Sequence, residues 1–115
     1  MWYSLIEITT GKDEMVARVT TDSNSPWFSG HFPNNPILPG IAQLKMVADL
    51  IAFSREKEVL HMTGLSRIKF KKIVRPGDPL EIHAARGMME DQYAFRISSN
   101  DKDICSGMIF FTPKI

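Results

Sequence analysis

The chain has 115 residues, of which 43% are hydrophobic and 23% are charged, and its formal net charge is +1. This length and composition predict one soluble domain over residues 1–115 with a single core. The near-neutral charge argues against a nucleic-acid-binding protein that relies on broad electrostatic attraction. The single cysteine, Cys105, excludes an intrachain disulfide, and no apolar run reaches the ~20 residues needed to span a bilayer. The start has no signal-peptide pattern, so we expect a cytoplasmic protein.

The first elements along the chain are two strands followed by a long loop. Residues 2–8 and 15–21 predict a strand pair around a turn at 10–14. Residues 21–40 are then dense in Pro, Gly, Asn and Ser. A loop of this length inside a compact domain is usually functional or disordered, and its prolines and aromatic residues favour an ordered one.

A helix is predicted from Ile41 to about Arg55, where the chain contains neither Gly nor Pro. Apolar residues cover most of its circumference, so the helix should be buried on nearly all sides. One short sheet does not easily bury this much apolar surface. We therefore expect a homodimer with His31 close to the interface, and leave open whether it assembles further.

Four strands in a row are predicted after the helix, over 65–74, 79–89, 92–98 and 103–111. In the first of them Ile68 and Phe70 alternate with Lys69 and Lys71, as in a half-buried strand. Consecutive strands with short turns form an antiparallel sheet. The sequence therefore predicts an α+β domain whose sheet wraps the single helix.

The three histidines lack the spacing of a metal-binding motif, and we predict neither a metal nor a cofactor. His83 lies in a predicted strand and His61 follows the predicted helix, so surface, packing or capping roles account for both. His31 differs, because it lies in a proline-rich segment nine residues before Gly40. The pKa of imidazole is close to neutral pH, which makes His31 a candidate general base, although a loop histidine is more often structural.

The Pro39-Gly40 pair opens the predicted helix and makes its N-terminus a candidate binding site for a thioester. The first amides of a helix have no internal partner, and the helix dipole adds partial positive charge there. Because Gly40 has no side chain, a substrate carbonyl can approach its N–H closely. That N–H would polarise the carbonyl, acidify the α-proton and stabilise the developing enolate oxygen. The alternative is that the pair merely starts a helix, as it does in many proteins that are not enzymes.

The segment GHFPNNPILPG at 30–40 resembles the active-site segment of the hot-dog-fold 3-hydroxyacyl-[acyl-carrier-protein] dehydratases. Their pattern places His-Phe-Pro, here His31-Phe32-Pro33, ahead of a Pro-Gly pair, here Pro39-Gly40. The segment SRIKFKKIVRPGDPLEI at 66–82 is similar to a second family stretch, a strand pair joined by a Pro-Gly-Asp turn. The order of elements fits the family over the whole chain.

The resemblance implies a hot-dog fold, a curled antiparallel sheet around one long central helix, that works as a dimer with an acyl tunnel between protomers. It implies His31 as the base and Gly40 as the amide that holds the thioester carbonyl, on a helix opened by Pro39. The candidate tunnel walls, each equally an ordinary core residue, are Phe32, Leu38 and Phe70. The implied activity is dehydration of 3-hydroxyacyl thioesters of acyl carrier protein or coenzyme A in fatty-acid, polyene or related lipid biosynthesis.

The helix departs from the family pattern at one position. The family has Glu or Asp five residues after the Pro-Gly glycine, facing the histidine of the other subunit, and this chain has Lys45 there. Asp49 follows one turn later on the same side of the helix. Either Asp49 or Lys45 replaces the missing acid, or the two only line a wet dimer interface. The Gln43-Leu44 pair is similar to divergent branches of the family that are linked to specialised polyene or lipid pathways.

Two further functions stay open at this stage. One is a hot-dog thioesterase in which a carboxylate such as Asp49 activates water, and the other is a non-catalytic acyl-binding or assembly subunit. His31 favours the dehydratase, whereas the loss of the acid favours the non-catalytic subunit. A basic cluster is either a docking surface for an acidic acyl carrier protein or a solvated strand face, and it consists of Lys69, Lys71, Lys72 and Arg75.

Overall fold

The computed structural model describes residues 3–22, 37–55, 60–87 and 91–113, and the interpretations that fall on His31 and Phe32 lie outside these ranges. The elements in chain order are β1 (Tyr3–Thr10), β2 (Glu14–Thr21), α1 (Gly40–Ser54), β3 (Leu60–Phe70), β4 (Pro79–Arg86), β5 (Gln92–Ser99) and β6 (Lys102–Pro113). Among the described residues, no helix combines the length and the hydrophobicity that crossing a bilayer requires.

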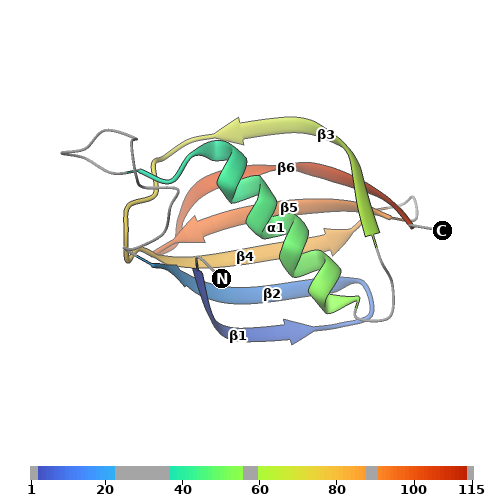
Figure 1. Cartoon of the computed structure of the whole chain (residues 1–115), viewed down its shortest axis with the longest axis horizontal. Coiled ribbons are helices and arrows are strands. Elements are labelled where there is room, and N and C mark those ends of the chain that lie inside the picture. The colour runs from blue at the N-terminus through green and yellow to red at the C-terminus, as the bar shows by residue number, and fades with distance from the viewer. Residues whose placement is uncertain (1–2, 23–36, 56–59, 88–90, 114–115) are drawn as a thin grey trace.

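The six strands form one sheet in the order β1-β2-β4-β5-β6-β3, and every neighbouring pair is antiparallel. The sheet curls, and α1 crosses its concave side diagonally (Figure 1). The prediction of an antiparallel sheet around a single helix is therefore confirmed. In the chain α1 follows β2 and precedes β3, whereas β2 and β4 are neighbours in the sheet. The helix and β3 are therefore inserted between two adjacent strands.

The core lies between the concave side of the sheet and the inner side of α1. Alternate residues of the central strands point inward, as the period of a strand requires. These inward residues are Met15, Ala17 and Val19 of β2, Leu80, Ile82 and Ala84 of β4, and Tyr93, Phe95 and Ile97 of β5. They pack with the inner helix residues Met46, Val47 and Ile51, each of which is 0% exposed. Burying a side chain of this size contributes roughly 1.5–3 kcal/mol, so this layer accounts for the position of the helix.

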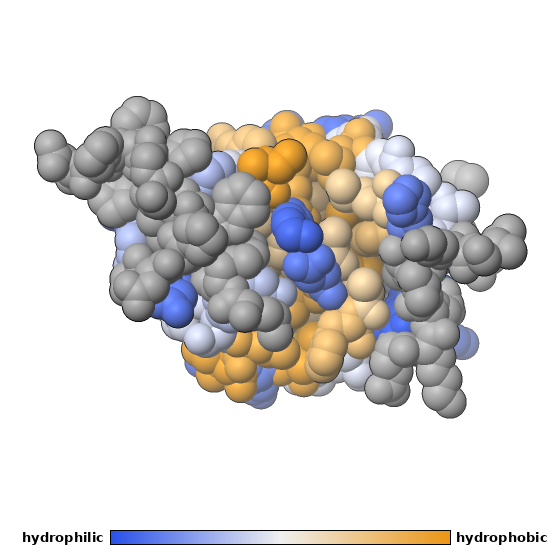
Figure 2. Space-filling model, in the orientation of Figure 1, coloured by the Kyte–Doolittle hydropathy of each residue, from blue (hydrophilic) through white to orange (hydrophobic). Residues whose placement is uncertain are grey.

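The outer side of α1 is uncovered in the single chain, although burial on nearly all sides was expected. Ile41 is 67% exposed and Phe53 is 61% exposed, and Lys45 and Asp49 between them are exposed as well. These four residues, at intervals of four, form one stripe along the helix. Figure 2 shows this side of the molecule, where a polar strip runs through an apolar surface. The sheet thus buries one side of the helix and leaves the other side exposed in the single chain.

Strand β3 differs most from the sequence-based expectation. It spans Leu60–Phe70, so it begins five residues earlier and ends four residues earlier than predicted. Its pairing with β6 shifts register twice, between Met62 and Gly64 and between Ser66 and Lys69. At the second shift Arg67 has φ 55, a left-handed conformation. Each bulge changes which side chains face the core, and Phe70, predicted to alternate inward, is 51% exposed.

The C-terminal end of α1 is anchored by a buried ion pair. Arg55 follows the helix, and its guanidinium donates to Asp91 Oδ1 at 2.5 Å and to the Tyr93 hydroxyl at 3.0 Å. The Arg55 and Asp91 side chains are only 11% and 9% exposed. Asp91 belongs to the turn that precedes β5, and its carbonyl accepts from the Phe111 N–H of β6 at 2.8 Å. The pair therefore joins the end of the helix to two strands.

Candidate active site

The first turn of α1 presents backbone N–H groups at the surface of the fold. Pro39 is the N-cap, with φ −60 and ψ 151, and it supplies no side-chain cap. The Pro39 carbonyl accepts from the N–H groups of Ala42 and Gln43 at 3.1 and 3.2 Å. The preceding amides, those of Gly40 and Ile41, belong to the set that has no intrahelical acceptor. Helix geometry and the dipole therefore make Gly40 N–H a donor for a polar oxygen.

Phe70 closes over the position where Gly40 would carry a side chain. A Cβ placed on Gly40 would lie 2.6 Å from Cζ of Phe70 and 2.9 Å from its Cε1. The end of β3 is thus packed directly against the start of the helix. The contact between Gly40 and Phe70 was not predicted, and Phe70, a candidate tunnel wall, is not among the residues that line the groove between α1 and β3.

An apolar groove of about 390 Å³ runs between α1 and β3. It starts at Ile41, next to Gly40, and continues for three turns along the helix to Ala52. The residues that line it are Ile41, Leu44, Lys45, Ala48, Asp49, Ala52, Met62, Leu65 and Phe111. Apolar side chains predominate, and Lys45 and Asp49 are the charged residues of this lining. An acyl chain whose carbonyl reached Gly40 would find an apolar surface beside it.

Lys45 and Asp49 pair loosely on the exposed side of the helix. Lys45 Nζ lies 3.9 Å from Asp49 Oδ1, and the two side chains are 57% and 46% exposed. An exposed pair of this kind adds little stability. Asp49 also acts on Tyr3, because burial first and the charge of Asp49 second raise the pKa of the Tyr3 hydroxyl to about 12. The predicted i,i+4 pair therefore exists, and its carboxylate also lies beside the small pocket that Tyr3 lines.

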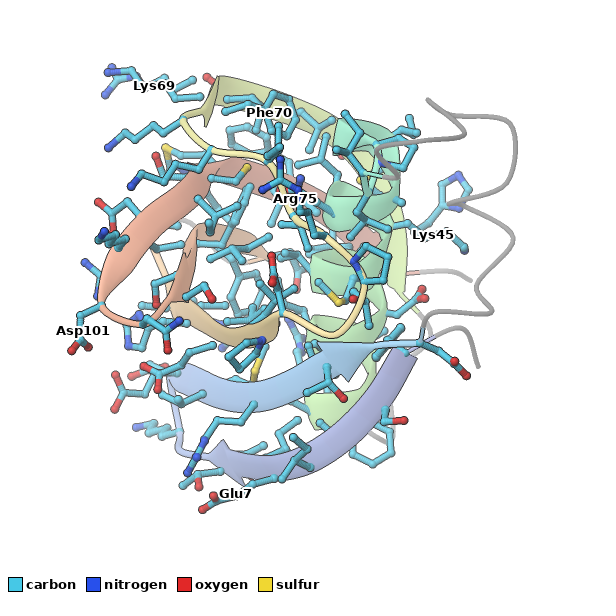
Figure 3. All side chains as sticks on the ribbon, turned by 90° about the vertical axis from the view of Figure 1, so that its left-hand side faces the viewer. Glu7, Lys45, Lys69, Phe70, Arg75 and Asp101 are labelled. Carbon is cyan, nitrogen blue, oxygen red and sulfur yellow. The ribbon has the colours of Figure 1, made fainter. Side chains whose placement is uncertain are left out.

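The remaining predicted site residues that the structure describes lie away from the groove. Leu38 is 2% exposed and belongs to the core, and it is not among the residues that line the groove. Lys69, Lys71, Lys72 and Arg75 are all exposed around the end of β3. Figure 3 shows Lys69 and Lys45 on opposite sides of the molecule with Phe70 between them. The basic cluster is therefore a separate surface from the groove.

Several groove residues could not be identified from the sequence. Met62 and Leu65 face the groove because β3 is irregular, and Phe111 reaches it from β6. Ala48 and Ala52 could have suggested the groove weakly. Small residues four positions apart lie on the same side of a helix and leave a depression there. The two other histidines do not join the site, because His61 is an exposed residue of β3 and His83 of β4 lies 3.5 Å from Glu14.

Comparison with known proteins gives consistent results. A family model described as ApeI-like, ApeI dehydratase, matches residues 7–108. A 3-hydroxyacyl-[acyl-carrier-protein] dehydratase FabZ of Caldicellulosiruptor bescii is 31% identical over 120 residues, which cover 96% of this chain and 84% of the relative. The FabZ of Thermoanaerobacter pseudethanolicus is 40% identical over 82 residues, or 66% of this chain and 57% of the relative.

A solved structure shares the fold over nearly the whole chain. The dehydratase heterocomplex ApeI:P from Xenorhabdus doucetiae matches with a TM-score of 0.86 and 23% identity, and the match covers 96% of this chain and 98% of that one. This similarity confirms the hot-dog fold that the sequence predicts. The family model, which matches most of the chain, establishes that this chain belongs to the ApeI-like dehydratases, and the FabZ relative agrees with it.

Proposed function

We propose that this chain removes water from a 3-hydroxyacyl thioester to give the 2-enoyl thioester, with acyl carrier protein or coenzyme A as the carrier. The observation that carries the proposal is the first turn of α1, where the Gly40 amide, which has no intrahelical acceptor, adjoins an apolar groove of about 390 Å³. The FabZ relatives, named as 3-hydroxyacyl-[acyl-carrier-protein] dehydratases, support the substrate class. A cytoplasmic location remains a prediction.

In the proposed reaction the thioester oxygen accepts from Gly40 N–H, and the acyl chain extends along the groove. The polarised carbonyl acidifies the proton on C2, and the neutral imidazole of His31 takes it. The electron pair of that C–H bond forms the C2–C3 double bond while the C3–O bond breaks. The hydroxyl group takes up a proton from solvent and leaves as water, and the His31 imidazolium returns its proton to solvent, so the protons balance. The role of His31 rests on its position in the sequence, nine residues before Gly40.

The Lys45–Asp49 pair is proposed to orient the hydroxyl group that leaves. It lies on the groove where the related enzymes carry a single acid, and its Nζ–Oδ1 distance of 3.9 Å leaves both groups able to bind another partner. Because neither residue reproduces the family acid, we expect slow dehydration by the wild type. Lys45→Glu should then raise the rate.

A second hot-dog chain is proposed to cover the exposed stripe of α1. Ile41 and Phe53, at 67% and 61% exposed, would remain in water otherwise, together with Met62 and Leu65 of β3 at 43% and 40%. We propose a homodimer. The Xenorhabdus relative belongs to a dehydratase heterocomplex, ApeI:P, so a different subunit is the competing partner. Sedimentation of the pure protein separates these cases, because a monomer at micromolar concentration would contradict the homodimer.

The experiment that tests the activity is incubation with 3-hydroxyacyl and 2-enoyl pantetheine thioesters, followed by mass spectrometry. The expected product of the first is lighter by one water, and the second should gain one in the reverse direction. His31→Ala should abolish both conversions, since general base catalysis is typically worth ~10²–10⁴ in rate. Release of free acid and thiol would show a thioesterase instead, and binding without turnover would show an acyl-binding subunit.

The basic cluster at the end of β3 is proposed to dock an acidic acyl carrier protein. Lys71 Nζ forms an ion pair with Asp103 Oδ2 at 3.5 Å. Lys69 and Lys72 are exposed close to Phe70 in the chain. Attraction between exposed charges weakens with salt. Reversing Lys71 and Lys72 to Glu should therefore raise the KM for a carrier-linked substrate about tenfold at low salt. The KM for a pantetheine thioester should not change, and equal effects on both substrates would exclude the docking role.

A further inference from the structure

Gln43 is a buried polar residue in the first turn of α1. It is 3% exposed and lies on the inner side of the helix, above Met46 and Val47. Among the residues that the structure describes, none donates a hydrogen bond to its Oε1, which is buried. An unsatisfied buried acceptor lowers stability, whereas a methionine of similar length would pack there without that loss. Packing alone does not explain a carboxamide at this position.

The orientation of the carboxamide follows from its one described side-chain contact. Nε2 of Gln43 lies 3.5 Å from the Leu38 carbonyl oxygen. A carbonyl oxygen can only accept, so the nitrogen must face it and Oε1 must point away. The distance is at the long end for a hydrogen bond, as is common in active sites without a bound ligand.

Gln43 holds both carbonyls that precede Gly40. Its side chain contacts the Leu38 carbonyl, and its backbone N–H donates to the Pro39 carbonyl at 3.2 Å. Leu38 is held from its other side as well, because its N–H donates to the Val74 carbonyl at 2.8 Å. The ring of Pro39 fixes its φ, so these contacts determine the remaining freedom of the Pro39–Gly40 peptide. The N–H of that peptide is the proposed donor to the thioester.

We infer that Gln43 is a positioning residue, which aims Gly40 N–H at the thioester oxygen by holding the Leu38 carbonyl. This inference rests on the proposed function, because it needs the Gly40 amide to bind the carbonyl. Losing an oxyanion donor outright costs ~10²–10³ in kcat. Gln43 acts one step away from that donor, so its loss should lower kcat about tenfold and leave KM within about twofold.

The test is Gln43→Met, which keeps the length of the side chain and removes its hydrogen bonds. Two quantities are measured: kcat and KM for a 3-hydroxyacyl pantetheine thioester, and the vibrational frequency of a bound ¹³C-labelled thioester carbonyl. A saturated acyl pantetheine thioester serves for the second, because it cannot lose water. In the wild type the bound carbonyl should absorb at lower frequency than in solution, and in Gln43→Met the frequency should move back towards the free value.

A control variant removes a buried hydrogen bond elsewhere. Thr21 is 4% exposed, and its Oγ1 donates to the Arg75 carbonyl at 3.2 Å and accepts from Gly77 N–H at 3.1 Å. Thr21→Val should lower the melting temperature and leave both kcat and the carbonyl frequency unchanged. If Gln43→Met does not fold, Gln43→Asn replaces it, because it keeps the carboxamide but cannot reach Leu38.

The outcomes separate this inference from the proposed function. If Gln43→Met and Gln43→Asn bind the thioester with the wild-type frequency and wild-type kcat, Gln43 has no positioning role and the dehydratase proposal stands. If both variants lose the frequency shift while the wild type retains it, the inference is upheld. If the wild type itself neither shifts the carbonyl nor converts the substrate, the proposed function fails and the inference fails with it.

Discussion

Replacing Gly40 with alanine is expected to lower kcat for a 3-hydroxyacyl pantetheine thioester by about 100-fold or more. The added Cβ would lie 2.6 Å from Cζ of Phe70, a separation at which one of the two groups must move. Movement of the helix start shifts the amide that is proposed to hold the thioester, and a shift of about 1 Å is enough to cost 100-fold. Steady-state kinetics on the folded variant measure this effect.

Two companion variants show whether the clash is the cause. Gly11→Ala adds the same methyl group in the β1–β2 turn, where its nearest neighbour would be 3.6 Å away, and it should retain wild-type turnover. Adding Phe70→Ala to Gly40→Ala removes the ring that Cβ would meet and should recover part of the loss. An unchanged kcat in a variant whose helix start has moved would contradict the assignment of the site to the first turn of α1. An unchanged kcat with only the half-exposed Phe70 ring displaced would show that the ring moves in place of the amide.

Replacing Arg55 with methionine is expected to lower the free energy of unfolding by about 3–5 kcal/mol, because it leaves the Asp91 carboxylate buried without its cation. The aliphatic part of the side chain is kept, so the change isolates the charge and its hydrogen bonds. Both partners are nearly buried, at 11% and 9% exposed, and the Tyr93 hydroxyl loses a donor as well. Urea denaturation, with the midpoint and the m-value reported separately, measures the change.

The matched control is the exposed pair on the outer side of the sheet. Arg18 Nη1 lies 3.3 Å from Glu7 Oε2, with side chains 61% and 58% exposed. Glu7→Gln should therefore change stability by less than about 1 kcal/mol. Equal losses from the two variants would mean that burial does not decide the strength of the Arg55–Asp91 pair. The Arg55→Met variant should also show no loss of turnover beyond that caused by unfolding, since the pair lies at the opposite end of α1 from Gly40.

The regular part of the fold could be predicted from local patterns. Pro39-Gly40 marked the start of α1 to within one residue, and alternation located β4 and β5, because each pattern follows directly from the period of the element. The irregular part could not. Nothing in the alternation of β3 indicates that Arg67 adopts φ 55, and only the structure shows the two register shifts. Asp91 and Arg55 are 36 residues apart, so their pairing depends on the tertiary fold.

The parts of the candidate site that depend on local helix geometry could be predicted, and the parts that depend on the tertiary fold could not. Gly40 and the Lys45–Asp49 pair depend on helix geometry alone, and the structure has both, with Phe70 against the glycine. Leu38 was either a wall of the acyl site or an ordinary core residue, and the structure places it in the core, 2% exposed. The sequence does not reveal which side of the chain faces the groove. The assignments of His31 and Phe32 lie outside the described residues and remain predictions.

The register shifts of β3 also bear on how the protein avoids aggregating. β3 and β1 are the two outer strands of the sheet, and the structure gives each of them at least one irregularity, in β1 between Leu5 and Glu7. An outer strand with a straight, regular backbone is a template onto which unrelated chains can add in the manner of a fibril. Bulges break the regular spacing of the free N–H and C=O groups, so only short stretches of either edge can accept a foreign strand. If the proposed partner covers the exposed stripe of α1, the bulged margins of the sheet would keep association confined to that one surface.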